Sequence, residues 1–261
     1  MEANNTKPSL TAKGAANLES EAVVSIRNLR KAFGTKVVLS DITMDLKKGE
    51  NLVILGKSGQ GKSVTIKCIL GLLYPDSGSL KVFGEEVSAL DEEGLKNLRI
   101  KTGFLFQSGA LYDSMTVEKN LEFPLTRVLK LKDQKDIRNR IEEVLDSVGL
   151  LDAIDKMPSD LSGGMRKRIG LARTMILQPE IMLYDEPTTG LDPITSREIS
   201  DLILLMQKKN RTSSIIITHD MECARITADR VLIMNDGKFI AEGNFEQLEQ
   251  SKDQLVRSFF K

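Results

Sequence analysis

Two glycine-rich loops, each followed by a helical pattern, limit the possible folds more than any other feature of the sequence. The first, Gly56-Lys57-Ser58-Gly59-Gln60-Gly61-Lys62-Ser63, follows the apolar run Asn51–Leu55 and opens a helical pattern over Lys62–Leu73. Glycines let successive backbone N–H groups converge on an anion, and the helix N-terminus adds partial positive charge. The second, Leu161-Ser162-Gly163-Gly164-Met165, precedes a helical pattern over Arg166–Leu177. The pair predicts a phosphate ligand gripped from two sides.

The first loop matches the strand–GxxxxGK[ST]–helix pattern of a nucleotide phosphate cradle at every position. Lys62 is expected to reach the β- and γ-phosphate oxygens, and the Ser63 hydroxyl is expected to coordinate Mg²⁺. The pattern therefore predicts ATP-binding residues throughout the loop, namely Gly56, Lys57, Ser58, Gly59, Gln60, Gly61, Lys62, Ser63 and Val64.

Overall composition narrows the class of protein. Lys+Arg and Asp+Glu both number 37, so the charge balance provides no global attraction to nucleic acid or to an anionic membrane. The two cysteines, Cys68 and Cys223, are too few and too far apart for a disulfide framework, which favours a reducing compartment. No apolar run approaches the ~20 residues that span a bilayer. Residues 1–20 are polar and predict a flexible N-terminal tail.

The order of the predicted elements indicates an α/β fold. Val23–Ile26 and Val37–Ile42 are typical of a small antiparallel sheet, whereas the other strand candidates alternate with helices at Ser196–Lys209 and Met221–Ala228. Those other candidates are Asn51–Leu55, Ile181–Tyr184, Ser213–Thr218 and Val231–Met234. Such alternation predicts a mostly parallel sheet that binds ligands at the carboxyl ends of its strands.

The middle of the chain, roughly residues 107–178, differs from the rest because it contains no strand-like run. The helical stripe here is formed by Ile137, Ile141, Val144, Leu145 and Val148. We expect a helical lobe inserted into the α/β core.

Two strand ends carry polar groups suited to hydrolysis. Asp185 and Glu186 end the apolar run Ile181–Tyr184, and adjacent buried carboxylates favour a compensating cation such as Mg²⁺. Asp185 is predicted to anchor the metal, and Glu186 to act as general base or water-positioning group. His219, the single histidine, follows Ser213–Thr218 and is expected at the same sheet edge, where it can contact the γ-phosphate or the attacking water.

The second loop is a weaker signal on its own. Ser162 can cap the following helix, and the amides of Gly163 and Gly164 form an open nest for an anion. The basic run Arg166-Lys167-Arg168 is expected to be a solvated helix face.

Together these motifs resemble the nucleotide-binding subunit of an ATP-binding cassette (ABC) transporter, over about residues 21–245. The resemblance implies a P-loop NTPase fold with the small antiparallel β subdomain and the inserted helical lobe. It also implies that Phe33, in Lys31-Ala32-Phe33-Gly34, stacks on adenine, that Gln107 touches Mg²⁺, and that Asp192, in Gly190-Leu191-Asp192, organises a dimer interface. In that family the Ser162–Gly164 cradle binds the γ-phosphate held by the opposite subunit of a head-to-tail homodimer.

Two longer stretches resemble the ATPases of Mla-type bacterial systems, which move phospholipid between inner and outer membranes through an MCE-protein complex. They are Gln107–Val117 with Asn120–Leu125, and Leu161–Arg168 with Asp185–Thr195. Polar amino-acid importers are close relatives and remain an alternative, as does a soluble ABC ATPase acting on ribosomes or DNA. A nucleotide-binding module without catalysis is disfavoured by the intact Lys62, Asp185, Glu186 and His219.

The resemblance implies an ATPase located at the cytoplasmic face of the inner membrane, with integral permease subunits and an MCE-type lipid-binding protein as partners and no nucleic acid. The ATPase domain is expected over 21–250, followed by a short tail over 251–261. An apolar set could line a groove for a permease helix or form the core of the lobe: Leu111, Tyr112, Met115, Val117, Leu121 and Phe123.

Overall fold

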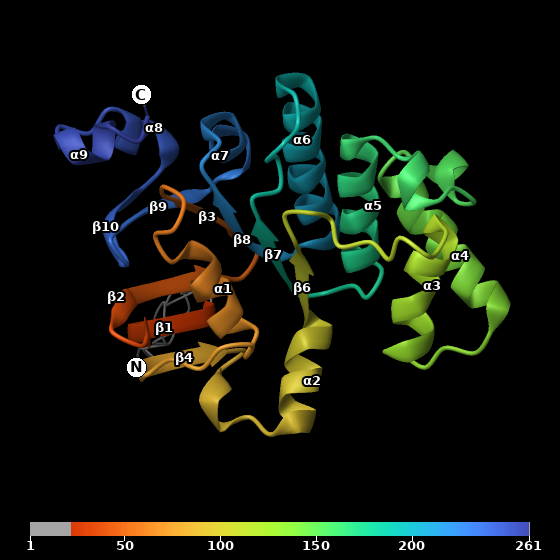
Figure 1. Ribbon diagram of the computed structural model, residues 1–261, viewed down its shortest axis with the longest axis horizontal. Coiled ribbons are helices and arrows are strands. Elements are labelled where there is room, and N and C mark those ends of the chain that lie inside the picture. Colours follow the sequence, from red (N-terminus) through yellow and green to blue (C-terminus); the bar gives the residue numbers. More distant parts are fainter. Residues whose placement is uncertain (1–21, 261) are drawn as a thin grey trace, which may run out of the picture.

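The computed structural model describes residues 22–260, which form a ten-stranded sheet flanked by helices (Figure 1). The strand order is β5-β4-β1-β2-β10-β9-β3-β8-β7-β6. The strands are β1 (Ala22–Phe33), β2 (Lys36–Lys47), β3 (Asn51–Leu55), β4 (Ser77–Val82), β5 (Glu85–Glu86), β6 (Thr102–Leu105), β7 (Ile181–Asp185), β8 (Ser213–Thr218), β9 (Arg230–Asn235) and β10 (Lys238–Gly243). The helices are α1 (Lys62–Ile69), α2 (Glu92–Lys101), α3 (Val117–Arg127), α4 (Gln134–Ser147), α5 (Gly163–Met175), α6 (Pro193–Asn210), α7 (Met221–Thr227), α8 (Phe245–Glu249) and α9 (Gln254–Arg257).

One half of the sheet is parallel and the other half is antiparallel. Strands β9, β3, β8, β7 and β6 are paired in parallel in that order. The β1–β2 hairpin and β4 are antiparallel, and β10 pairs with β2 at a single position to join the halves. The predicted combination of a parallel core with a small antiparallel subdomain is confirmed.

Strand β3 lies at the centre of two hydrophobic cores. Because side chains alternate along a strand, Leu52 and Ile54 pack into one core while Val53 and Leu55 pack into the other. All four side chains have no exposed surface. Burial on both faces explains why the segment is an unbroken apolar run. The buried strand β3 also gives the first glycine loop, which follows Leu55, a rigid support.

The segment between β6 and β7 contains α3, α4 and α5, and Figure 1 shows α3 and α4 grouped at the side of the molecule beyond α5. The stripe on α4 is buried, with Ile137, Ile141 and Leu145 at most 2% exposed. The predicted amphipathic helix is therefore confirmed. None of the helices within residues 22–260 combines the length and the apolar character needed to cross a membrane.

Several element boundaries differ from expectation. Helix α1 ends at Ile69 rather than Leu73, because Gly71 adopts a φ of 61° and both Leu72 and Leu73 donate backbone hydrogen bonds to Lys67. The short edge strand β6 was not predicted: it spans four residues and contains Gly103, so it lacks a strand-like apolar run.

The boundaries of α5 and α6 also differ from the predicted helices. Helix α5 covers Gly163–Met175 rather than Arg166–Leu177, and α6 begins at Pro193, where proline is suited to the first helical turn. The expected tail 1–20 lies outside the described residues.

Candidate functional site

The first glycine loop connects β3 to α1 at the carboxyl edge of the parallel strands. Gly61 precedes α1 with a φ of 103°, a conformation that L side chains rarely adopt. A Cβ at Gly61 would also lie 2.7 Å from the Leu39 side chain and 2.9 Å from the Val38 carbonyl oxygen. The last glycine of the loop is thus required both by conformation and by the close approach of β2.

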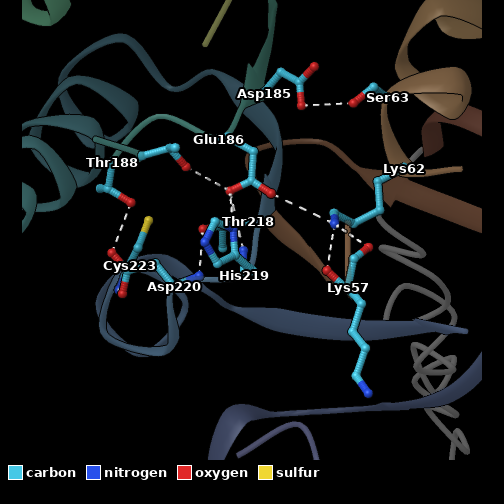
Figure 2. Close-up of polar contacts among 12 residues, drawn as sticks. Lys57, Lys62, Ser63, Asp185, Glu186, Thr188, Thr218, His219, Asp220 and Cys223 are labelled. Carbon is cyan, nitrogen blue, oxygen red and sulfur yellow. Dashed lines mark hydrogen bonds and ion pairs between the residues drawn. The ribbon is translucent and has the colours of Figure 1, made fainter. Parts of the chain in front are cut away.

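Lys62 is buried and turns back onto its own loop (Figure 2). Its ammonium donates to the carbonyl oxygens of Gly56 and Lys57, the latter at 3.0 Å, and lies 3.7 Å from Glu186 Oε1. Burial lowers the pKa of Lys62, and the carboxylates of Glu186 and Asp185 oppose that shift. A buried cation satisfied by two carbonyl oxygens is suited to exchange them for phosphate oxygens.

Ser63 and Asp185 form a second contact across the same edge. The Ser63 hydroxyl donates to Asp185 Oδ1 at 3.0 Å. Burial raises the pKa of the Asp185 carboxyl, and the Ser63 hydrogen bond opposes the rise. A hydroxyl and a carboxylate at this spacing are hard oxygen donors of the kind that Mg²⁺ prefers. The residues present therefore fit a magnesium ion.

Glu186 occupies an unusual backbone position directly after β7. Its φ is 53°, and its backbone N–H donates to Ile217 on β8 at 2.9 Å. The carboxylate lies 2.7 Å from His219 Nδ1 and accepts a hydrogen bond from Thr189 Oγ1 at 3.2 Å. The parallel pairing of β7 with β8 aligns their carboxyl ends, which brings Glu186 and His219 together. Strain held by several contacts is common at functional sites.

These groups surround one cavity of about 280 Å³. The predicted site residues that line it come from the first loop, from Gln107 and from the ends of β7 and β8. They are Ser58, Gly59, Gln60, Gly61, Lys62, Ser63, Val64, Gln107, Asp185, Glu186 and His219, joined by Val38 and Thr189. Thr189 follows Glu186 in a loop with no catalytic signal of its own, which is why sequence reasoning missed it.

The remaining predicted residues lie outside the lining of this cavity. Phe33, at the end of β1, is 48% exposed, as expected of a ring free to stack on a ligand, and Lys31 Nζ lies 5.6 Å from its centroid. Asp192 caps α6, accepting from the backbone N–H groups of Ile194 and Thr195.

The second cradle faces solvent at the start of α5. Ser162 caps this helix, as its sequence position predicts, by accepting from the Met165 N–H at 3.2 Å. Ser162 and Gly163 are exposed, whereas Gly164 is buried because the Thr195 side chain would lie 2.6 Å from a Cβ there. One copy of the chain does not bring this cradle to the cavity of the first loop.

The basic run Arg166-Lys167-Arg168 was predicted to be a solvated helix face, and that prediction is wrong for Lys167. Arg166 is exposed, but Lys167 is only 6% exposed and donates to the backbone carbonyl oxygens of Gln107 and Glu186. A helix turns ~100° per residue, so three consecutive basic residues cannot share one face.

The apolar set proposed for a groove divides between two environments. Val117 and Leu121 are fully buried in the lobe core, whereas Tyr112 is 41% exposed and its ring lies 5.2 Å from that of Phe123. A separate cavity of about 310 Å³ lies between the sheet edge and the lobe, with Phe104, Phe106, Pro124 and Arg173 among its lining residues.

A strand–loop–helix phosphate cradle, a Ser–Asp pair suited to Mg²⁺ and a Glu–His pair at the carboxyl edge of a parallel sheet define a P-loop ATPase. Residues 39–189 match the family model described as "ABC transporter". The chain belongs to this family and is the ATP-binding, ATP-hydrolysing subunit of a transporter.

Curated relatives carry several names at similar identity. The chain is 37% identical to the intermembrane phospholipid transport system ATP-binding protein MlaF of Haemophilus influenzae, covering 93% of this chain and 91% of that protein. It is 37% identical to the probable ribonucleotide transport ATP-binding protein mkl of Mycobacterium leprae, over 94% of this chain and 71% of that protein. It is 38% identical to the methionine import ATP-binding protein MetN of Rhizobium johnstonii, over 86% of this chain and only 61% of that protein.

Solved structures agree on the fold. CbiO1 of Clostridium perfringens, part of the ABC transporter complex cbiONQ, matches with a TM-score of 0.82 at 29% identity, over 91% of this chain and 94% of that one. The ATP-binding cassette MJ0796, in a dimeric post-hydrolysis state bound to ADP and Pi, matches with a TM-score of 0.77 at 29% identity, over 85% and 98% of the two chains.

Proposed function

We propose that this chain powers phospholipid transport between inner and outer membranes as the ATPase subunit of an Mla-type system. The observation that carries the proposal is the resemblance of Gln107–Val117 and Leu161–Arg168 to Mla-type ATPases, together with the 37% identity to MlaF over 93% of this chain. The mkl and MetN relatives match at 37% and 38% identity, so the cargo has to be decided by experiment.

The working unit is a head-to-tail homodimer. In one copy the Ser162–Gly164 cradle is solvent-facing and does not line the cavity formed by Gly59–Ser63. A second copy can bring its own cradle over that cavity, and two-fold symmetry then creates two equivalent sites. The dimeric form of the ATP-binding cassette MJ0796 supports this arrangement.

Hydrolysis begins from the arrangement in Figure 2, where Lys62 is held by the loop carbonyls and by Glu186. A triphosphate in the cradle offers Lys62 stronger, charged acceptors, so the Lys62–Glu186 contact is released. The freed Glu186 carboxylate orients the attacking water, and His219 at 2.7 Å fixes that carboxylate and contacts the γ-phosphate.

Ser63, Asp185 and Gln107 are the residues that would hold magnesium. The Ser63 hydroxyl and the Asp185 carboxylate are already within 3.0 Å of one another, and Gln107 lines the same cavity. When bound at these residues, Mg²⁺ would supply the positive charge that offsets the negative charge on the phosphate groups during hydrolysis.

Permease subunits are proposed to dock at the cavity between the sheet edge and the lobe. Two exposed apolar side chains line it: Leu72 is 50% exposed and Phe106 is 46% exposed. Phe106 directly precedes Gln107, so a helix seated here would contact the segment that enters the ATP site. A permease docked here would hold the chain peripherally at the cytoplasmic face of the inner membrane, and the proposed phospholipid cargo implies an MCE-type lipid-binding protein as a further partner.

A second candidate cargo is an amino acid or another small solute, favoured by the 38% identity to MetN. A ribosome- or DNA-directed ATPase is less favoured, because equal numbers of acidic and basic residues give no electrostatic drive toward nucleic acid. ATPase stimulation by nucleic acid would support that third function instead.

Glu186→Gln tests the enzymatic part of the proposal. The amide keeps the size of the side chain but cannot act as a base, so turnover should stop while ATP binding and ATP-dependent dimerisation persist. Size-exclusion chromatography with and without ATP reports the dimer. Full ATPase activity in this variant would contradict the role of Glu186.

The cargo is tested by pulling down a tagged chain from detergent-solubilised membranes. Co-purification of a multi-span permease with an MCE protein supports phospholipid transport. Recovery of the permease with a periplasmic amino-acid receptor would contradict phospholipid transport and support solute import.

A further inference from the structure

Lys167 is an anomaly among the charged residues of the described chain. It is 6% exposed, yet no carboxylate oxygen lies within ion-pair distance of its ammonium among the described residues. Burial lowers the pKa of Lys167, opposed by the more distant Glu186 and Asp185 carboxylates. Burying a cation without a partner in contact is costly, so a position that retains one is a candidate for a specific role.

The two acceptors of Lys167 explain that position. Its ammonium donates to the backbone carbonyl of Gln107 and, at 3.3 Å, to that of Glu186. Gln107 lies on the segment that leads into the lobe, whereas Glu186 lies at the end of β7 in the sheet. One side chain from α5 therefore connects both segments that bring groups into the ATP site.

Helix α5 holds the Gln107 segment along a whole face. Gly170 lacks a Cβ where one would lie 2.8 Å from the carbonyl oxygen of Gly109, so this backbone rests directly on the helix. Arg173 donates to the carbonyl of Ala110 one turn further along. Positions 167, 170 and 173 recur every three residues, which places them on one side of the helix. Figure 1 shows the chain after β6 running past α5 toward the lobe.

The same helix begins at the second cradle. Ser162 caps α5, and Lys167 follows five residues later, about one and a half turns along the helix. A helix moves as a rigid rod over such a distance, so a shift imposed on Ser162 is passed to the Lys167 ammonium.

We propose that Lys167 is a positioning residue that couples the two ATP sites of the dimer. The inference rests on the proposed head-to-tail arrangement. When the cradle of one subunit closes on the partner's γ-phosphate, α5 moves with it, and Lys167 carries the backbones of Gln107 and Glu186 in its own subunit toward their catalytic positions. Occupation of one site thereby promotes hydrolysis at the other.

The test compares ATPase kinetics of Lys167→Met with the unaltered chain, each full-length and purified with the membrane subunits that accompany it. Methionine fills similar space without a donor. We expect ATP affinity within about twofold, kcat lowered at least about tenfold, and a Hill coefficient for ATP reduced toward one. Lys135→Met is the matched control, because Lys135 is an exposed lysine on α4 of the same lobe.

A purely structural role gives a different pattern: a lower melting temperature with kcat per folded molecule and the Hill coefficient unchanged. That result would overturn the inference. If Lys167→Met does not fold, Lys167→Gln replaces it. Glutamine retains a donor on a side chain one bond shorter, which cannot reach both carbonyl oxygens, so the same loss of cooperativity is expected.

The Glu186→Gln chain separates failure of the inference from failure of the proposed function. If ATP dimerises Glu186→Gln and Lys167→Met still hydrolyses ATP with normal kcat and cooperativity, only the coupling role is wrong. If ATP does not dimerise Glu186→Gln, the head-to-tail arrangement fails and the coupling role fails with it.

Discussion

His219 Nδ1 lies 2.7 Å from Glu186 Oε2, across the ends of two adjacent parallel strands. The His219 backbone N–H also faces that oxygen at 3.4 Å, so the carboxylate is held from the ring and from the main chain. The opposite oxygen, Oε1, faces Lys62 at 3.7 Å. A single carboxylate thus lies between Lys62 of the first glycine loop and His219 at the end of β8.

His219→Ala should lower kcat by at least about 100-fold, the usual scale for a group that positions or transfers protons. ATP affinity should change little, because Lys62 and the glycine loop are untouched. Steady-state hydrolysis and fluorescent-ATP binding measure the two quantities. Weaker ATP binding with kcat unchanged would place His219 in ground-state binding instead.

Gly61→Ala should abolish nucleotide binding and destabilise the fold by about 1–3 kcal/mol, since the new Cβ combines a φ of 103° with contacts at 2.7 and 2.9 Å. Gly49→Ala is the matched control: its φ is 73°, but nothing lies within 4 Å of an added Cβ. Gly49→Ala should lower the free energy of unfolding by about 1 kcal/mol and leave nucleotide binding intact. Equal effects in thermal melts and ATP titrations would contradict the steric reasoning.

Ser63→Ala should weaken magnesium binding and make ATP binding by the protein less dependent on added Mg²⁺. It also removes the hydroxyl that opposes the raised pKa of Asp185. The pKa of Asp185 should therefore rise further, and because the ionised form binds metal, magnesium-dependent ATP binding should be lost at a higher pH on acidification. A Mg²⁺ titration at several pH values measures both effects. Ser63→Thr keeps a hydroxyl and should behave like the unaltered chain. If magnesium-dependent ATP binding by Ser63→Ala were lost at the same pH as in the unaltered chain, the effect of Ser63 on the pKa of Asp185 would be refuted.

Asp76→Asn should weaken ATP binding on the order of two- to fivefold, the effect expected of an exposed ion pair. The Asp76 carboxylate accepts from Lys31 Nζ at 2.8 Å and from the Ala32 N–H at 2.6 Å, and so orders the residues before Phe33. Lys31 and the Ala32 amide hold the pKa of Asp76 below its usual value. The contact is therefore present above the ordinary aspartate pKa and is lost only as pH falls through the lowered one. Isothermal titration with ATP at saturating Mg²⁺ tests this, and an unchanged Kd would contradict it.

Cys68 and Cys223 should both be inert in the native protein. They are at most 1% exposed, and burial raises the pKa of each thiol to about 11, so little reactive thiolate forms near pH 8. A thiol reagent should label neither cysteine until denaturant is added, and then both. Rapid native labelling would contradict their burial.

Local patterns predicted the strands that carry the site. Strand β3 and strand β8 fall where their apolar runs lie, because a strand buried on both faces needs an uninterrupted run of apolar side chains. Strand β6 could not be predicted in this way, since Thr102 and Gly103 depend on β7 for their pairing and burial. The end of α1 at Ile69 also depends on the positive φ of Gly71, which the spacing of apolar residues does not reveal.

The candidate site was predictable wherever a residue acts at the end of its own element. Ser63, Glu186 and His219 each follow or open a strong local pattern, and the rule that parallel strands align their carboxyl ends places them together. Thr189 and Lys167 have no such pattern. Gln107, which accepts from Lys167, lies 60 residues away in the chain, so only packing between distant segments defines that contact. Thr189 lies three residues after Glu186, but a threonine in a loop is not a catalytic signal by itself.

The first glycine loop, the parallel core and the polar residues at the strand ends could all be predicted from the sequence, because glycine spacing and apolar periodicity act over a few neighbouring residues. Three features became visible only in the folded chain: the backbone that packs on α5, the contact between Lys62 and Glu186, and the burial of Lys167 beside the exposed Arg166. Those outcomes depend on close packing between segments distant in the chain, which no local pattern encodes.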